Sequence, residues 1–403
     1  MILIEELKNR LINNIDLSRN ISDEELNETI TEMVINEYHD SASLKEKMRI
    51  SRELFNAIRG LDVLQEILDD DDITEIMING SDRIFIEKNG KLFRYNGRFS
   101  SEEKLRDVIQ TIAARANKRV NESSPILDTR LYDGSRVNIV LDPVSIAGAA
   151  VTIRKFPKDS ITMDRLIQLG SITQEAVQFL KGLVENGYNI FISGGTGSGK
   201  TTFLNALSNF IPQDERIITI EDSAELKIEH IDNLVSLECR QANVEGENAI
   251  TIRDLIRTSL RMRPSRIIVG EVRGAEALDM LQAMNTGHDG SLSTGHGNSP
   301  QDMLSRLEVM TMMAGEELPL MAIRGQIASA IDIMVHLGRL RDGSRKVLNI
   351  SQIEGLEENN IKLSSLFEYK YNADKSKSGV LVRTDIPLLI RKGMMAGEYE
   401  KVN

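Results

Sequence analysis

The sequence predicts an α/β protein: a parallel sheet that carries a glycine-rich loop, preceded by a smaller α+β domain and a short helical segment. Three observations support this prediction. Residues 194–201 read GGTGSGKT and lie between the apolar run 188–193 and a helical pattern at 202–207. From about residue 165, helix and strand patterns alternate, which is typical of a parallel sheet with helices on both faces. Residues 59–156 instead show short strand patterns joined by turn signals.

These patterns divide the chain into four segments. Residues 1–58 are polar, with apolar side chains at helical spacing, and predict a helical N-terminal segment. Residues 59–156 predict the α+β domain, and residues 157–164 predict a linker. Residues 165–403 predict the domain with the glycine-rich loop and a C-terminal extension.

Local patterns also predict the elements of the α+β domain. A short helix is expected at 61–68, and the acidic run 69–72 after it is interpreted as a solvated helix end rather than a metal site. Asn89-Gly90 is a hairpin turn signal. Strands are expected at 73–78, 83–86, 91–95, 137–141 and 149–154.

The glycine-rich loop predicts a binding site for nucleotide phosphates. It fits the pattern G-x-x-x-x-G-K-[ST], with Gly194 and Gly199 before Lys200 and Thr201. Glycines let the backbone approach an anion closely, and loop N–H groups and the N-terminus of the following helix then bind it. In such loops the lysine reaches the β- and γ-phosphates of ATP and the hydroxyl holds Mg²⁺. The other residues expected to line the nucleotide are Gly195, Thr196, Gly197, Ser198 and Thr202.

Composition excludes several classes of function. The 403 residues carry a net charge of −12, contain no Trp and are 4% aromatic, which argues against nucleic-acid binding through a basic face and stacked bases. Cys239 is the only cysteine, so an intrachain disulfide and a cysteine-cluster zinc site are excluded. No signal sequence or run of ~18 apolar residues is found. A cytoplasmic protein is expected, with any membrane association peripheral and through partners.

Hydrolysis of the nucleotide needs carboxylates near the phosphates, and the apolar run 217–220 ends in such residues. Glu221 and Asp222 follow it directly, with Glu225 close behind. Ligands of open parallel sheets bind at the carboxyl ends of the strands, so these side chains are expected near the metal and phosphates. Asp222 is the expected metal-side residue, and Glu221 and Glu225 are expected to add negative charge there. Carboxylates exposed at a strand end remain an alternative.

A second apolar run, 267–269, resembles a Walker B strand. Gly270 stands where an aspartate is common, and Glu271 follows. Glu271 is therefore expected to polarise the attacking water or to help place Mg²⁺ through water. Farther on, His288 and His296 have no familiar zinc-ligand spacing. His296 is expected to contact the γ-phosphate or its water, and His288 is expected to be structural.

Arginines predict a contribution from a second subunit. Arg253, Arg257 and Arg261 recur every four residues and would line one face of a helix. This stripe is either a solvated basic face or an interface at which an arginine reaches a neighbour's nucleotide. Arg136 and Arg154, in the α+β domain, are further candidates.

Together these motifs resemble the secretion and pilus-assembly ATPases of the type II/type IV secretion superfamily. Residues 217–226 (IITIEDSAEL) resemble the family's aspartate box, and residues 266–296 resemble its Walker B and histidine boxes. Residues 123–138 and 152–156 resemble stretches of its N-terminal domain. Among the branches, the chain most resembles the tight-adherence (Flp) pilus ATPase, often called CpaF-like. The type II branch carries a four-cysteine zinc module, which cannot form with Cys239 alone, and this favours the tight-adherence or the type IV secretion branch. The resemblance covers roughly residues 50–350.

The resemblance implies a PAS-like domain, a linker and a RecA-like motor domain, assembled as a homo-hexameric ring with ATP between the two domains. It implies an ATP-hydrolysing motor that acts on an inner-membrane platform protein to drive pilus assembly or secretion. By position, Lys200 and Thr201 match the family's P-loop, Glu271 its Walker B glutamate, and His296 its histidine box; Glu221, Asp222 and Glu225 match the aspartate box, and Arg136 and Arg154 match N-terminal-domain arginines that reach the phosphates.

The chain departs from the family pattern at two places, and two other functions stay open. Ser265 stands where aspartate is usual before the Walker B strand, and Gly297 follows His296 where alanine is common. The glycine at 270 keeps open a nucleotide-sensing scaffold with little turnover. A RecA-like nucleic-acid translocase is the other alternative, whereas the lack of an N-K-x-D motif argues against a GTPase.

Overall fold

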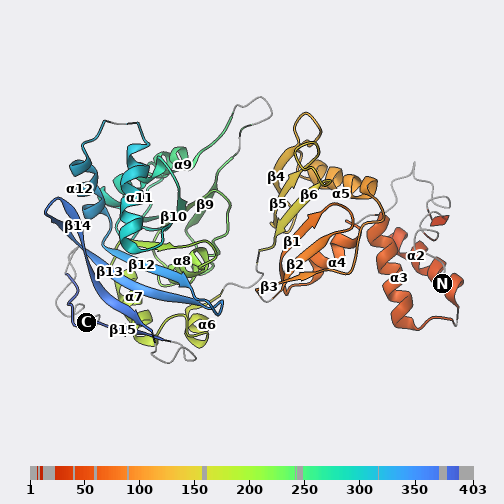
Figure 1. Cartoon of the computed structure of the whole chain (residues 1–403), viewed down its shortest axis with the longest axis horizontal. Helices are drawn as coiled ribbons and strands as arrows, with labels where there is room; N and C mark the ends of the chain where they lie inside the picture. The colour runs from red at the N-terminus through yellow and green to blue at the C-terminus, as the bar shows by residue number, and fades with distance from the viewer. Residues whose placement is uncertain are drawn as a thin grey trace. The chain divides into compact units, whose positions relative to one another are not determined.

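The computed structural model describes residues 7, 10–11, 23–39, 41–58, 61–88, 90–156, 161–240, 242, 248–315, 317–371 and 379–389. Most of the first 22 residues, Asn89 of the predicted turn and residues 157–160 of the predicted linker lie outside this set. The backbone divides into two compact units, residues 1–158 and 159–403 (Figure 1). Each unit is described by itself below.

The first unit begins with two helices, α2 (Asp23–Tyr38) and α3 (Leu44–Ile58). They pack against each other through a small apolar core that includes Ile30, Val34 and Leu54. Both helices lie within the segment that the sequence predicts to be helical.

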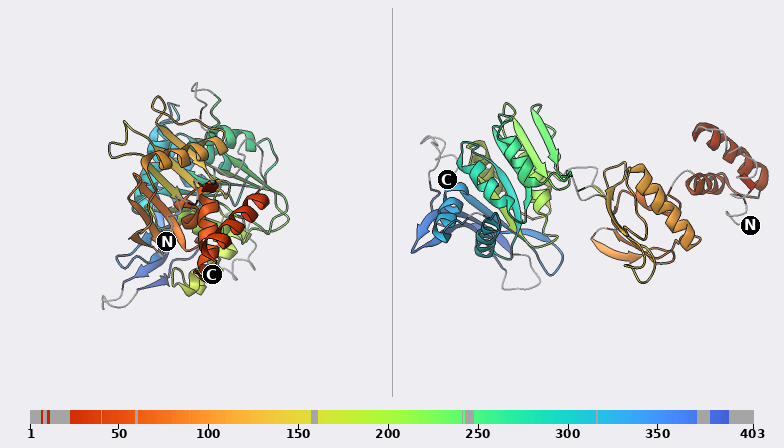
Figure 2. Two further views of the ribbon diagram at one scale, coloured as in Figure 1. Left: turned by 90° about the vertical axis from the view of Figure 1, so that its right-hand side faces the viewer. Right: turned by 90° about the horizontal axis from the view of Figure 1, so that it is seen from above.

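The rest of the first unit is an antiparallel sheet of six strands in the order β3-β2-β1-β6-β5-β4. Figure 2 shows α5 lying along one face of this sheet. Strand residues alternate between the α5 core and the opposite, more polar face, as half-buried strands do. The elements are α4 (Val63–Asp69), β1 (Ile73–Asn79), β2 (Ile84–Lys88), β3 (Lys91–Arg94), α5 (Glu102–Arg115), β4 (Ile126–Arg130), β5 (Arg136–Val140) and β6 (Ala150–Arg154).

The predicted strands of this unit are present within one or two residues of their expected ends, but β4 was not predicted. Its sequence, ILDTR, has no run of apolar residues, although Leu127 and Thr129 are buried in the sheet beside β5. The PAS-like character that the resemblance implies stays a prediction.

The second unit is built on one nine-stranded sheet with the order β15-β14-β13-β12-β7-β11-β10-β8-β9. The run from β12 to β9 is parallel, whereas β13, β14 and β15 join as antiparallel hairpins beyond β12. The α/β class is therefore confirmed, but the expectation of a parallel sheet is wrong for its C-terminal part. Consecutive strands with only short turns between them cannot form parallel pairs, which need a long crossover.

The strands of this sheet are β7 (Ile190–Gly194), β8 (Ile217–Glu221), β9 (Leu234–Glu238), β10 (Arg266–Val272), β11 (Leu292–His296), β12 (Ile333–Arg339), β13 (Arg345–Glu357), β14 (Asn360–Lys370) and β15 (Val380–Arg383). The helices are α6 (Met163–Gln168), α7 (Gln174–Glu185), α8 (Lys200–Ser208), α9 (Ile252–Ser259), α10 (Glu276–Asn285), α11 (Pro300–Met312) and α12 (Leu320–Ala330).

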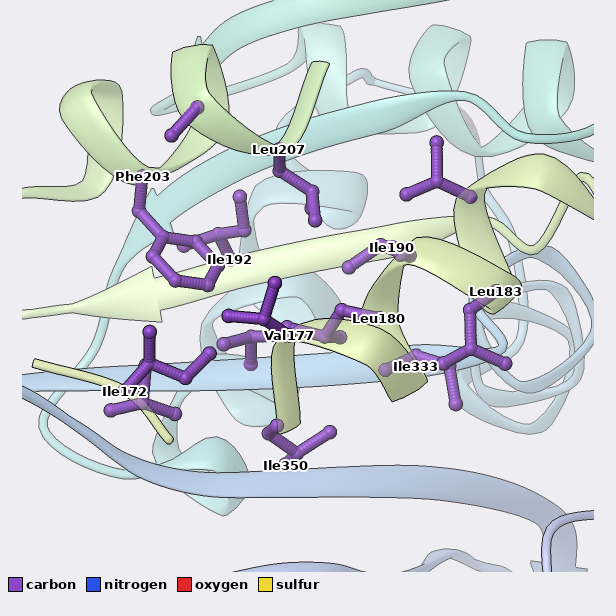
Figure 3. Packing of buried hydrophobic residues seen from close by; sticks show 14 of the residues in the cluster. Ile172, Val177, Leu180, Leu183, Ile190, Ile192, Phe203, Leu207, Ile333 and Ile350 are labelled. Carbon is purple, nitrogen blue, oxygen red and sulfur yellow. The ribbon is translucent and has the colours of Figure 1, made fainter. Parts of the chain in front are cut away.

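Two apolar cores cover the two faces of this sheet. One contains side chains of α6, α7 and α8, and the other contains side chains of α9 to α12. Neighbouring residues of a central strand serve opposite cores: Ile190 and Ile192 of β7 pack with α7 and α8 (Figure 3), and Phe191 faces the other core. Burial on both faces explains why these strands are continuous apolar runs, and it holds their carboxyl ends rigidly at one edge.

Candidate nucleotide-binding site

The glycine-rich loop joins the carboxyl end of β7 to the start of α8. Gly197 and Gly199 have positive φ angles of 70° and 92°, which glycine adopts at little cost. Gly199 is the N-cap of α8, makes no side-chain cap bond, and the first turn holds no acidic residue. The free N–H groups at this helix start suit an anion.

Lys200 lies against this loop rather than in water. Lys200 is only 7% exposed to solvent. Its Nζ donates to the carbonyl oxygens of Gly194 and Gly195, each at 3.2 Å. The Nδ1 atom of His296 is 3.1 Å from the same nitrogen. Burial lowers the pKa of Lys200, and the nearby Glu271 partly opposes this shift. The ammonium group is therefore held among neutral acceptors that a phosphate could replace.

His296 connects Lys200 to Glu271. The Nε2 atom of His296, at the end of β11, is 2.9 Å from Oε1 of Glu271 on β10. Burial lowers the pKa of His296, as do the charges of Lys200 and Arg273, while Glu271 acts in the opposite direction. A neutral ring accepts from Lys200 through Nδ1 and carries its proton on Nε2, toward Glu271.

Glu271 is held from its other side. Arg273 donates to its Oε2 at 3.1 Å and also lies 3.8 Å from Oδ2 of Asp222. Oε1 of Glu271 is buried, and within the described residues no donor is aligned with it well enough for a hydrogen bond. A buried carboxylate oxygen without an aligned donor is able to accept a proton from a water molecule.

Glu221 points away from this chain of contacts. It is 3% exposed, and its Oε1 accepts backbone N–H bonds from Glu225 at 2.9 Å and Leu226 at 3.1 Å. Burial raises the pKa of Glu221 to about 7, against the effect of these hydrogen bonds. The side chain thus holds the loop after β8, and the catalytic role expected for it stays a prediction. Glu225 contributes a backbone N–H to this bond, and its own side chain is half-buried.

The same side chain explains the glycine in the Walker B strand. A Cβ atom at Gly270 would lie 2.9 Å from Cγ of Glu221, a distance that real Cβ atoms essentially never show. Glu221 therefore fills the space that an aspartate at position 270 would need.

Two arginines beside the loop were missed by sequence reasoning. Arg339 and Arg345 face each other across the β12–β13 hairpin. Arg345 Nε donates to the carbonyl of Gly197 at 2.9 Å, and its Cδ is 3.3 Å from where a Cβ of Gly199 would lie. Arg345 is 148 positions from Gly197, and no local pattern links a hairpin arginine to the loop.

The predicted arginine stripe is shorter than expected. Helix α9 ends at Ser259, so Arg261 lies in the following turn and the three residues do not share one helical face. Arg253 and Arg257 donate through Nε to the buried Asp279 of α10, at 2.7 and 2.8 Å. This bond orients both guanidinium groups, and Arg257 is half exposed.

Arg136 and Arg154 belong to a row of cations in the first unit. They pair directly across β5 and β6, and Arg130 of β4 pairs with Arg136 on its other side. Side chains of directly paired residues share a face, so three arginines lie in line on the sheet face opposite α5. Glu75 of β1 continues the row.

These residues fit a nucleoside triphosphate with Mg²⁺. The glycine backbone leaves room for phosphates, Lys200 supplies the cation, and the half-buried Thr201 supplies a hydroxyl at the first turn of α8. Across the described part of the chain, no three His, Cys, Asp or Glu side chains gather as a metal site of their own. The fold and the loop define a P-loop nucleotide-binding protein.

The chain belongs to the family described as "Type II/IV secretion system protein", which matches residues 58–376. A putative conjugal transfer protein of Mycobacterium tuberculosis is 35% identical over 312 residues, 76% of this chain and 88% of the relative. The conjugal transfer protein TrbB of Rhizobium radiobacter is 33% identical over 320 residues, 78% and 94% of the two chains. The type IV secretion system protein PtlH of Bordetella pertussis is 33% identical over 321 residues, covering 73% and 95%.

Solved structures share the fold. The ATPase DotB of Legionella pneumophila has a TM-score of 0.51 at 23% identity, covering 73% of this chain and 81% of that one. The pilus retraction motor PilT, solved with ADP, has a TM-score of 0.51 at 18% identity, covering 81% and 83%. At these identities the likeness concerns the fold alone. None of the helices in the described ranges has the length and apolar character needed to cross a bilayer.

Proposed function

We propose that this protein is an ATP-hydrolysing ring motor of a secretion or pilus machine. The observation that carries the proposal is the unbroken chain of contacts from Lys200 through His296 to Glu271, which joins the phosphate loop to a buried carboxylate. Loop, histidine and glutamate stand at the ends of three adjacent parallel strands, the edge at which such sheets bind ligands.

Each residue of the site has a distinct role in this proposal. Mg-ATP, when bound, supplies the phosphoanhydride that water cleaves and part of the charge compensation. Lys200 gives up its carbonyl partners for phosphate oxygens, and the Thr201 hydroxyl and the Asp222 carboxylate serve the metal. Glu271 orients and polarises the water, because Arg273 holds its Oε2 while no donor within the described residues is aligned with its Oε1. Glu221 positions the loop that carries Glu225.

His296 is neutral in this proposal, and its ring does not compensate the negative charge of Glu271. It accepts from Lys200 and holds its own proton on the side of Glu271, so it adds no positive charge that would neutralise the general base. Arg345 and Arg339 add positive charge beside the loop from the same subunit.

In a homo-hexamer, arginines of one subunit would help to compensate the phosphate charge of the nucleotide bound to a neighbouring subunit. Arg257 is oriented by Asp279 and half exposed, and Arg136 and Arg154 stand in a row of cations. We propose these as candidates that reach a neighbouring subunit's nucleotide. The ring would act at the inner face of the cytoplasmic membrane through a platform protein. The motif resemblance supports tight-adherence pilus assembly as its task. The conjugal transfer and type IV secretion relatives support substrate secretion as the second candidate.

Steady-state ATP hydrolysis by the full chain tests the proposal. Glu271→Gln should lower kcat about a hundredfold or more while ATP still binds, because the amide cannot accept a proton. Glu357→Gln, at an exposed glutamate of β13, is the matched control and should hydrolyse like the wild type. Wild-type protein that binds ATP and does not hydrolyse it, alone or with its membrane platform, would indicate a nucleotide-sensing scaffold. Turnover that requires single-stranded DNA would indicate a translocase.

A further inference from the structure

A buried histidine outside the predicted motifs touches the start of the phosphate loop. His336 lies on β12, beside Ser193 of β7 in the pairing register, and is 6% exposed. Its Nδ1 atom is 2.9 Å from Oγ of Ser193, a fully buried hydroxyl. Ser193 is followed directly by Gly194, whose carbonyl accepts from Lys200.

The ring of His336 also lies near the segment that follows β11. The backbone of Asn298, two residues beyond His296, lies close enough to the ring to favour its protonated form. Because burial lowers the pKa of His336 overall, the ring is neutral. A neutral ring can donate to the Asn298 carbonyl from Nε2 and accept the Ser193 hydroxyl proton at Nδ1. Both ring nitrogens are then satisfied.

A second contact draws the same segment to the loop. The N–H of Gly297 donates to the carbonyl of Gly194 at 3.4 Å, the carbonyl that Lys200 also contacts. A Cβ at position 297 would lie 2.9 Å from Cβ of Met303 and 3.2 Å from its Cα, so an alanine there would push the segment away from α11. The glycine that departs from the family pattern therefore allows this segment to pack closely against α11.

The position of His336 in its strand indicates that the imidazole does more than fill the core. Its neighbours Val335 and Leu337 are buried apolar residues of one core, and Met334 is a buried apolar residue of the other. An apolar side chain at 336 would fill the same space without the cost of burying a polar ring. The imidazole instead joins the ends of two strands at the edge where the nucleotide is proposed to bind.

We propose that His336 is a positioning residue for ATP hydrolysis: it fixes the segment that follows His296 to the start of the phosphate loop, and so keeps His296 between Lys200 and Glu271. The inference rests on the proposed function. His336 touches neither nucleotide nor water in this scheme, and its effect passes through Ser193 and Asn298.

The test compares His336→Leu, which fills the space without hydrogen bonds, with His336→Gln, which keeps a donor and an acceptor. We expect His336→Leu to lower kcat about ten- to a hundredfold, because small misplacements of catalytic groups have effects of this size. The Kd for ADP should stay within about twofold, since the loop glycines and Lys200 are retained. His336→Gln should recover part of the lost rate.

Two further variants separate positioning from structure. Ser193→Ala should reproduce part of the loss, and adding it to His336→Leu should lower kcat little further, since both remove one contact. His288→Leu, at a half-buried histidine that bonds the Ala283 carbonyl before the start of β11, is the control and should hydrolyse normally. Hydrogen exchange of the Gly297 amide should accelerate in His336→Leu and not in His288→Leu.

The outcomes are distinguishable. No hydrolysis by the wild type would refute the proposed function and this inference with it. Wild-type hydrolysis with an unchanged His336→Leu rate would refute the inference alone. A lost rate accompanied by a similar loss of ADP binding and a fall in Tm, not recovered in His336→Gln, would make His336 merely structural and would also overturn the inference.

Discussion

The glycine of the Walker B strand offers the sharpest test of how this site is packed. In Gly270→Ala the new Cβ would lie 2.9 Å from Cγ and 3.4 Å from Oε1 of Glu221. Glu221 cannot simply swing away, because its oxygens accept the N–H groups of Glu225 and Leu226. Either the alanine is compressed or these bonds lengthen.

The expected cost follows from both effects. Forcing an extra methyl group into a packed site costs about 1–3 kcal/mol, and weakening the hydrogen bonds to Glu221 adds about 1 kcal/mol. The free energy of unfolding should fall by about 2–4 kcal/mol. For a unit of this size that corresponds to a fall in Tm of about 5–15 °C.

Thermal unfolding of Gly270→Ala, Glu221→Ala and the double variant measures this coupling. Removing Glu221 makes room for the methyl group, so the double variant should be more stable than the sum of the single effects by about 1–3 kcal/mol. Gly325→Ala is the matched control: a Cβ there meets no atom within 4 Å, and alanine favours the helix α12. A Gly270→Ala variant as stable as the wild type, or strictly additive effects, would refute the packing argument.

Three further predictions follow from the contacts described. Arg345→Ala should weaken ATP binding about tenfold, which is the contribution of one charge-assisted hydrogen bond, in a titration with a fluorescent ATP analogue. Arg341→Ala, at an exposed arginine, is the control and should bind ATP like the wild type. Equal affinities of Arg345→Ala and the wild type would exclude Arg345 from the site. Asp279→Asn removes the ion pairs of Asp279 with Arg253 and Arg257. The free energy of unfolding in urea should fall by at most about 3 kcal/mol, because Arg257 is half exposed. An unchanged free energy of unfolding would mean that these ion pairs do not form. Burial raises the pKa of Glu221 from 4.5 to about 7, so its stabilising contribution is full below 4.5 and lost as the pH rises through 7. The Tm of the wild type should therefore fall relative to that of Glu221→Gln between pH 5 and 8 in metal-free buffer, and a constant difference would contradict the shift.

Much of the candidate site follows from local sequence. The positive φ angles of Gly197 and Gly199 are what the glycine pattern predicts, and Glu271 lies near the carboxyl edge of the sheet, where such sheets bind ligands. The catalytic roles assigned to these residues stay predictions. Sequence reasoning was incomplete for the arginine stripe. The arginine pattern continues to position 261, yet α9 ends two residues earlier, and Arg263 with a positive φ and Pro264 follow.

The sequence by itself determined the class of this protein: a glycine-rich loop between an apolar strand and a helix, and apolar runs long enough to be buried on both sheet faces. These are local properties, set by backbone freedom and by the period of apolar residues. Only the tertiary structure decided that Glu221 turns to the backbone and occupies the space at Gly270, that the C-terminal strands pair antiparallel, and that Arg345 and His336 reach the loop. The approach of Glu221 to Gly270, and those of Arg345 and His336 to the loop, join residues distant in the chain, and strand pairing and packing rather than a local pattern bring them together.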